Sequence, residues 1–331
     1  MNKKINKIKF IQMHKGWENP VKAISFLAVF AILLSITSQF VIPKSNETLK
    51  QYSAAGFYGE PKDSIDYVVL GDSNTAEGIS PLEAWKAYGY TGYVCGEPYQ
   101  TICGVYHLLK EVLSCQSPKL VVFETDMFFA KNGMEEVNNA ISNQISSVFP
   151  VERYHNNWKH LAYKDFISKT DYSWKHTTKG YKLQMVTTPF TYDKYMEETD
   201  QTAIINTTSI FYFNKLISLC KKNDISIFLL GVPCATSWDY AKHNAVSSLC
   251  AKKGLVFLDL NTEVKNSTFS FDWNTDSRDG GNHLNYYGAK KVSQYLADYF
   301  KQNYQLPDHR NDKSFSGWNE DLKTYEAEIA G

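Results

Sequence analysis

The sequence predicts an α/β fold in which a parallel sheet is covered by helices on both faces. Short apolar runs rich in β-branched residues alternate along the chain with longer segments that show helical spacing. Continuous apolar runs indicate strands that are buried on both sides, as in a parallel sheet. The chain has 331 residues, of which 43% are hydrophobic, which is enough for a large core and excludes intrinsic disorder.

Each element is predicted from its own residues. Strands are predicted where a short run is mostly apolar, at 66–70, 120–124, 225–231 and 255–258. Helices are predicted where the pattern becomes helical, at 81–88, 101–114, 205–222, 240–253 and 287–300. Functional side chains in parallel sheets lie at the carboxyl ends of the strands. We therefore expect them just after Leu70, Phe123, Leu230 and Leu258.

The alternation of strands and helices breaks down between residues 130 and 204. This stretch is long, aromatic and mixed in charge, so we predict an insertion that covers a site. The remaining boundaries follow from shifts in composition. They give a basic tail at 1–22, a membrane anchor at 23–42, a polar stalk at 43–64, the α/β domain at 65–303 and a C-terminal tail at 304–331.

The anchor is predicted from the distribution of charge. The formal net charge is zero, which argues against binding to nucleic acid. Residues 1–22 nevertheless hold six lysines and one glutamate, a net +5, so the other 309 residues carry −5. The run 23–42 follows directly. It contains 20 residues without a charge, which as a helix can cross a bilayer core of about 30 Å.

Lysines on one flank of this run predict a cytoplasmic N-terminus, which places everything after Pro43 outside the cell. A cleaved signal peptide is the first alternative, but residues 39–43 offer no small-x-small cleavage site. A buried core helix is the second, and the basic cluster beside the run argues against it. We therefore predict a single-pass membrane protein whose domain is extracellular.

No motif for a metal or a nucleotide is present, since the sequence lacks a P-loop, a GxGxxG turn and an HExxH pair. We therefore expect neither a metal nor a cofactor. The six cysteines lack CxxC spacing. Disulfides are permitted outside the cell, but in a core of this size buried free thiols are the favoured interpretation.

Two segments carry the residues for acyl chemistry. The first strand runs into Gly71-Asp72-Ser73-Asn74, which places a serine hydroxyl at the carboxyl end of the sheet. Far along the chain, residues 279–283 read Asp-Gly-Gly-Asn-His, just before the last predicted helix. A nucleophilic serine needs a base, and the base needs a carboxylate to orient it. These two segments supply all three groups.

Together, these motifs resemble those of the SGNH/GDSL hydrolase superfamily, over residues 64–303. The resemblance implies a three-layer flavodoxin-like fold, with Ser73 as nucleophile and His283 as general base. It also implies an oxyanion hole formed by the backbone N–H groups of Ser73 and Gly96, with Gly92 as the weaker alternative.

This chain departs from the family pattern at two places. The family's usual acid, three residues before the histidine, is replaced by a glycine, so Asp279 is our choice for the acid and Asp276 the alternative. The family's third-block asparagine is also absent. Thr125, which follows the second predicted strand, is the candidate for a third oxyanion donor.

Four further residues are candidates for substrate binding. Asn74 adjoins the nucleophile, Trp238 could stack on a sugar ring, and His155 and His243 could line an acceptor pocket. For each of these residues the alternative is a packed or surface role.

The anchor together with this domain resembles two kinds of bacterial protein: the D-alanyl transfer protein of the teichoic-acid pathway and the acetyl-transfer partners of membrane-bound O-acyltransferases. This resemblance implies an acceptor that is a cell-envelope polysaccharide or a teichoic-acid-like polymer, and a multi-spanning acyltransferase as partner. We expect an ester hydrolase or an O-acyltransferase acting through acetyl or alanyl esters. The alternative is a binding or scaffolding protein that kept the fold and lost turnover.

Overall fold

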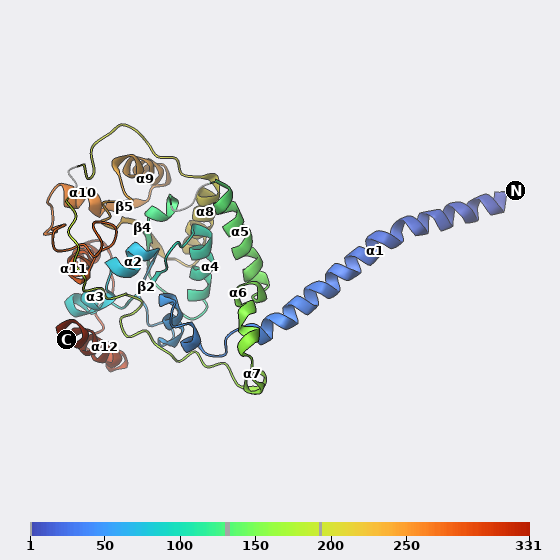
Figure 1. Cartoon of the computed structure of the whole chain (residues 1–331), viewed down its shortest axis with the longest axis horizontal. Coiled ribbons are helices and arrows are strands. Elements are labelled where there is room, and N and C mark those ends of the chain that lie inside the picture. The colour runs from blue at the N-terminus through green and yellow to red at the C-terminus, as the bar shows by residue number, and fades with distance from the viewer. Residues whose placement is uncertain (1, 130–132, 192–193) are drawn as a thin grey trace. The chain divides into compact units, whose positions relative to one another are not determined.

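The computed structural model describes residues 2–129, 133–191 and 194–331, which form two compact units (Figure 1). One unit comprises residues 1–44 and 144–170, and the other comprises residues 45–143 and 171–331. The larger unit contains the whole sheet. Its strands are β1 (Tyr67–Gly71), β2 (Gly92–Gly96), β3 (Leu120–Glu124), β4 (Ser226–Gly231) and β5 (Val256–Asp259).

All pairings in the sheet are parallel, and the strand order is β2-β1-β3-β4-β5. This is the flavodoxin-like order, which confirms the predicted fold class. The chain leaves β1 toward β2 on one side and later pairs β3 on the other, so the order reverses at β1. Such a reversal opens a crevice at the carboxyl ends of the strands, where ligands bind in open α/β sheets.

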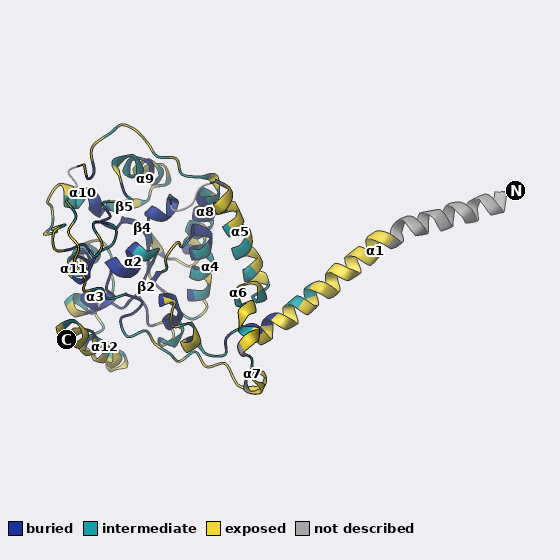
Figure 2. Cartoon of the chain, in the orientation of Figure 1, coloured by how far each residue is buried: buried dark blue, intermediate teal, exposed yellow. Residues whose placement is uncertain are grey.

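The helices of this unit pack on both faces of the sheet, as the continuous apolar strands predicted. Alternate residues of each strand point to opposite faces, so that Val68 and Leu70 join one apolar cluster and Val69 joins the other. Every residue of β1, β2 and β3 is buried, whereas the edge strand β5 is partly exposed (Figure 2). One face is covered by α4 (Ile102–Val112), α8 (Thr207–Lys222) and α9 (Tyr240–Lys253), and the other by α3 (Pro81–Tyr88) and α11 (Tyr286–Asn303).

The remaining helices are shorter or lie outside the two covering layers. The sequence did not single out α10, and α5 falls in the predicted insertion. Their bounds are α2 (Ser73–Gly78), α5 (Gly133–Val148), α6 (Val151–Tyr154), α7 (Tyr163–Ile167), α10 (Leu260–Lys265) and α12 (Ser316–Ala330).

The segments expected to be a stalk and a tail are both packed parts of the larger unit. The supposed stalk forms the 3₁₀ helices η1 (Asn46–Leu49) and η2 (Ser53–Gly59), and Phe57 is buried against Tyr93 of β2. The supposed tail forms α12, whose Trp318 lies 5.3 Å from the ring of Trp85. Polar composition suggested free linkers, but a few large aromatic residues in each segment suffice to bury it.

The smaller unit contains the long helix α1 (Asn2–Val41), which is exposed along most of its described apolar part (Figure 2). Its stretch Asn19–Val41 has a mean hydropathy of 2.2 and is long and apolar enough to cross a membrane or to serve as a signal anchor. Residues 144–170, the other part of this unit, contain α6, η4 (His155–His160) and α7.

All six cysteines are free, which is the interpretation favoured for a core of this size. Burial raises the pKa of the Cys220 and Cys250 thiols to about 12, so both remain protonated and unreactive.

Candidate active site

Ser73 is the first residue of α2, immediately after β1, at the point where the strand order reverses. The turn before it is tight because two glycines let the backbone come close. A Cβ on Gly71 would lie 1.7 Å from Thr75 Oγ1, and one on Gly96 would lie 2.6 Å from the carbonyl oxygen of Asp72. The Asp72 carboxylate accepts a 2.8 Å hydrogen bond from the Asn74 N–H and caps the helix. Ser73 itself is only partly buried.

The structure brings Ser73, His283 and Asp279 together in one hydrogen-bonded chain. His283 Nε2 lies 2.9 Å from Ser73 Oγ, and His283 Nδ1 lies 2.7 Å from Asp279 Oδ2. Asp279 Oδ1 also accepts a 2.7 Å hydrogen bond from the His283 backbone N–H. With the Nδ1 proton directed to the carboxylate, Nε2 is free to accept the serine proton.

Asp276, the alternative acid, lies elsewhere. Its side chain is fully buried and its two oxygens lie 2.9 and 2.7 Å from Lys291 Nζ. It also accepts a hydrogen bond from the Asp272 N–H. Asp276 therefore fastens the loop that carries His283 to α11, and the geometry favours Asp279 as the partner of the histidine.

Backbone hydrogen bonds from a third segment connect the two segments that carry these groups. Residues 181–190, in the second half of the predicted insertion, have no regular secondary structure and are hydrogen-bonded to both segments. The Lys182 N–H donates to the Ala76 carbonyl of α2 at 2.7 Å, and the Thr188 N–H donates to the Ser277 carbonyl at 2.9 Å. The Gly280 N–H returns a hydrogen bond of 3.2 Å to the Thr188 carbonyl. The insertion therefore sets the spacing between the serine helix and the histidine loop.

Arg278 is a member of the site that the sequence reasoning missed. Its guanidinium lies 2.6 Å from Glu77 Oε2, on α2, and 2.8 Å from Asp279 Oδ2. Burial alone would raise the pKa of Asp279, but hydrogen bonds from Arg278 and His283 outweigh it and lower that pKa to about 2. Asp279 is therefore ionised throughout the physiological range. The only sequence signal was a basic residue adjacent to the candidate acid.

Replacing Arg278 with glutamine is expected to lower kcat/KM for ester hydrolysis by about 10- to 100-fold. This factor corresponds to the free energy of one charge-assisted hydrogen bond. The reason is that Asp279 then loses its tie to α2. Lysine at the same position should rescue only part of this loss, because an ammonium cannot bridge two carboxylates as a guanidinium does. Steady-state kinetics with a p-nitrophenyl ester measures the effect, and equal activity in all three proteins would contradict it.

A cluster of acids lies at the carboxyl ends of β1 and β3, next to the nucleophile. Burial, followed by the charge of Asp126, raises the pKa of Asp72 to about 6. Burial and the charges of Asp72 and Asp126 raise the pKa of Glu124 well above its usual value. Within the described residues, Glu124 Oε2 is buried and has no hydrogen-bond partner. An ionised cluster of this kind costs stability.

We expect Asp72→Asn to stabilise the fold at pH 7 by about 1–3 kcal/mol, and much less near pH 4. The folded-state pKa of Asp72, about 6, lies above its ordinary 3.8, so the folded chain holds a proton that the unfolded chain has released between these values. Stability therefore falls as the pH rises through this window. Asparagine retains the oxygen that caps α2. Urea unfolding at the two pH values measures the difference, and an effect independent of pH would contradict it.

The expected oxyanion donors Thr125 and Gly96 lie in different surroundings. Thr125 is fully buried, and both its N–H and its hydroxyl donate to the Leu230 carbonyl, at 3.0 and 3.2 Å. It is therefore not available as an oxyanion donor, because both its donors bind a carbonyl of β4. Gly96 packs against the backbone of Asp72 and Ala76 beneath α2, and its own carbonyl accepts from Ser53 Oγ at 2.6 Å.

Of the substrate-binding candidates, only Asn74 adjoins the serine. It is buried, and among the described residues its Oδ1 has no hydrogen-bond partner. Trp238 and His243 converge on Asp259 instead, with Trp238 Nε1 and His243 Nδ1 lying 2.9 and 2.8 Å from Asp259 Oδ2. Trp238 is buried, so it offers no open face to a sugar. His155 belongs to the smaller unit, where its Nδ1 lies 2.8 Å from the Glu152 carbonyl.

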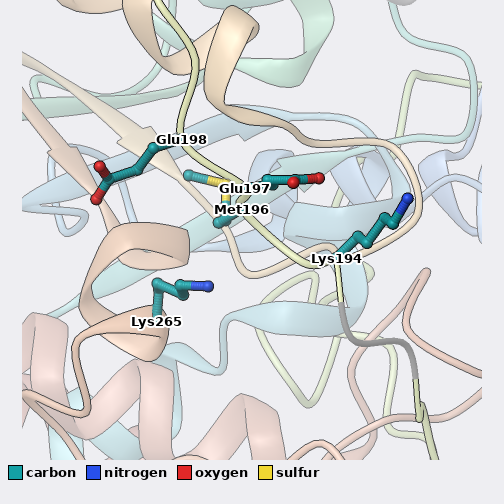
Figure 3. A pocket seen from close by; sticks show the side chains of 5 residues that line it. All are labelled: Lys194, Met196, Glu197, Glu198 and Lys265. Atoms are coloured by element: carbon teal, nitrogen blue, oxygen red, sulfur yellow. The ribbon is translucent and has the colours of Figure 1, made fainter.

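A separate cavity of about 430 Å³ is shown in Figure 3. It is lined by two lysines, two glutamates and a methionine: Lys194, Met196, Glu197, Glu198 and Lys265. None of the candidate catalytic residues lines it. The described residues contain no group of three or more histidine, cysteine, aspartate or glutamate side chains arranged to hold a metal ion.

The fold and this geometry define a flavodoxin-like α/β protein with a Ser–His–Asp chain at the carboxyl end of β1. No protein-family model matches the chain, and no curated protein matches it. It is similar to several solved structures. One is a GDSL-like lipase from Bacteroides thetaiotaomicron, with 12% identity, 71% of this chain and 87% of that chain covered and a TM-score of 0.36.

Another is a family 3 carbohydrate esterase from Clostridium thermocellum, with 14% identity, 72% and 96% of the two chains covered and a TM-score of 0.35. A third is an acetyl xylan esterase, with 16% identity, 71% and 98% covered and a TM-score of 0.34. All three TM-scores lie below 0.5, so the fold assignment rests on the strand order and the two packed faces.

Proposed function

We propose that this protein is a serine acyl hydrolase or O-acyltransferase that forms an acyl-enzyme on Ser73. The observation that carries the proposal is the hydrogen-bonded chain from Ser73 Oγ through His283 to Asp279 Oδ2, with distances of 2.9 and 2.7 Å. Two residues 210 positions apart in the sequence meet here at hydrogen-bond distance, at the carboxyl ends of the strands, where ligands bind in such sheets.

In the proposed reaction, His283 Nε2 takes the proton of Ser73 as Oγ attacks an ester carbonyl. Asp279 holds the imidazole in the required tautomer and stabilises the imidazolium that forms. The Ser73 and Gly96 N–H groups are the proposed donors to the oxyanion. His283 then returns its proton to the departing alcohol. An acceptor hydroxyl or a water molecule, deprotonated by the same imidazole, then attacks the acyl group. The bond from the acyl carbon to Ser73 Oγ breaks, and the imidazolium returns the proton to Ser73.

The acceptor and the compartment belong to the same proposal. An α1 that crosses the membrane, preceded by lysines, would place the active site outside the cell. There, a hydrolase would cleave acetyl or alanyl esters of a polysaccharide or of a teichoic-acid-like polymer, and a transferase would form these esters with the polymer as acceptor. A multi-spanning membrane-bound O-acyltransferase would be the partner that supplies the acyl group. Neither function nor mechanism calls for a metal or cofactor.

A second candidate function is that of a scaffolding protein without turnover. It is favoured by one observation, the commitment of both Thr125 donors to the Leu230 carbonyl, which leaves the proposed oxyanion hole with two backbone donors. Such a protein would bind an acyl-bearing polymer without transferring the acyl group.

Labelling with a fluorophosphonate distinguishes the two. The reagent phosphonylates an activated serine with loss of fluoride, so we expect one adduct, which peptide mapping places on Ser73. Ser73→Ala should abolish the adduct, whereas Ser80→Ala, the matched control beyond the end of α2, should retain it. A folded chain that does not react, or reacts equally after Ser73→Ala, would favour the scaffold.

A further inference from the structure

The juxtamembrane segment (residues 144–170) is held to the last turn of α1 by specific contacts. The Val151 N–H donates to Ser38 Oγ at 3.1 Å, and Asn157 Nδ2 donates to the Val41 carbonyl at 2.9 Å. The ring centroids of Phe40 and Phe166 lie 5.2 Å apart. Asn157 thereby satisfies one of the carbonyls that the end of a helix leaves unpaired. The segment and α1 form one compact unit.

The juxtamembrane segment exposes large apolar side chains. Exposed fractions reach 79% for Tyr163, 67% for Ile167 and 64% for Trp158. Tyrosine and tryptophan are the residues enriched where a protein crosses from hydrocarbon to headgroups. The apolar side chains concerned are Ile145, Val148, Trp158, Tyr163, Phe166 and Ile167. So many exposed apolar groups within 27 residues indicate a surface that is covered in the working protein.

Their position along α1 identifies what covers them. The apolar stretch Asn19–Val41 has 23 residues and is about 35 Å long as a helix, slightly more than a bilayer core of about 30 Å. Its last residues therefore lie at the edge of the hydrocarbon. Ser38, Phe40 and Val41, which contact the juxtamembrane segment, are among these residues. The exposed side chains are thereby fixed at the depth of the interface.

The charge of the segment suits the same location. Residues 144–170 contain four basic residues and two acidic ones, which gives a net charge of +2 beside phosphate headgroups. Short helices that combine apolar aromatic residues with basic ones lie flat in the interface rather than crossing it.

We propose that the juxtamembrane segment inserts its apolar side chains into the leaflet from which α1 emerges, so that the protein contacts the membrane through a helix and an interfacial segment. This inference rests on the proposed anchoring by α1. The occupant of the exposed surface is lipid rather than another protein.

Photolabelling with lipid tests the proposal on the full chain. The protein is reconstituted alone into phosphatidylcholine vesicles that contain a phosphatidylcholine with a diazirine on its acyl chain, then irradiated and mapped by mass spectrometry. We expect label in residues 19–41 and in residues 145–167. The peptide around Ile204, which is 91% exposed but lies in the larger unit, should stay unlabelled.

A double variant sharpens the test. Trp158→Ser with Ile167→Ser should lower labelling of residues 145–167 several-fold and leave labelling of residues 19–41 unchanged, whereas Ile204→Ser should change neither. Label in 19–41 with none above the Ile204 level in 145–167 would overturn the membrane contact while leaving the anchor intact. Absence of label from 19–41 would overturn the anchor, and this inference with it.

Discussion

Replacing Asp279 with asparagine is expected to lower kcat for ester hydrolysis by about 10³- to 10⁴-fold while the fold stays intact. The effect is large because the surroundings of His283 favour the wrong tautomer once the carboxylate is gone. Asn282 Nδ2 and an Arg278 guanidinium nitrogen lie 2.9 and 3.1 Å from His283 Nδ1. Both are donor groups.

With aspartate at position 279, the carboxylate lies closest to Nδ1, at 2.7 Å, and keeps the ring proton there. With asparagine, the two neighbouring donors can instead hydrogen-bond to an unprotonated Nδ1. The proton then moves to Nε2, which points at Ser73 Oγ and can no longer accept its proton. The imidazolium formed during attack also loses its counter-charge.

Asp276→Asn is the matched control, because Asp276 is the other candidate acid close to His283 in the sequence. Its carboxylate pairs with Lys291 rather than with His283, so kcat per folded molecule should change by less than about tenfold. Stability should instead fall by about 1–3 kcal/mol, as a buried charge-assisted contact is lost. Pre-steady-state acylation rates together with thermal unfolding measure both outcomes. The reverse pattern, with the rate lost in Asp276→Asn and retained in Asp279→Asn, would reassign the acid.

The sheet and the candidate nucleophile could be predicted because their signals are local. The apolar runs around Val68, Val121 and Leu229 each reveal a buried strand on their own, and Ser73 lies directly after one of them. The one strand missed, β2, contains two glycines within five residues, Gly92 and Gly96, which weaken its strand pattern. Those glycines are required by close packing, which is a tertiary property.

What could not be predicted depends on contacts between distant segments. Which aspartate serves as the triad acid depends on the ion pairs of the two candidates. Arg278 pairs with Asp279, and Lys291 pairs with Asp276. Trp238 and His243 looked free to bind a ligand, and only the fold shows that Asp259 engages both. Thr125 stood at the right strand end, but the sequence could not show that its donors are used by the neighbouring strand.

The same limit explains why the packing of the supposed stalk and tail was not predicted. Both segments contact a single buried lysine. Lys179 Nζ lies 2.8 Å from Glu60 Oε1, just beyond η2, and 2.5 Å from Asp321 Oδ2 on α12. It also lies 4.5 Å from the ring centroid of Trp318. The side chains of Lys179 and Glu60 are each only 1% exposed. Segments predicted as stalk, insertion and tail are thus joined by the two ion pairs of Lys179.

We expect Lys179→Met to destabilise the larger unit by about 3–5 kcal/mol, because it leaves the Glu60 carboxylate buried without its partner. Lys86→Met is the matched control. Lys86 also joins α12, through Glu326 at 2.7 Å, but both side chains are about half exposed, so its loss should cost no more than about 1 kcal/mol. Adding Glu60→Gln to Lys179→Met should recover part of the loss, since the stranded charge is removed. Unfolding by urea, followed by circular dichroism, compares the four proteins. Equal stabilities of the two lysine variants would mean that the ion pairs of Lys179 do not hold the three segments together.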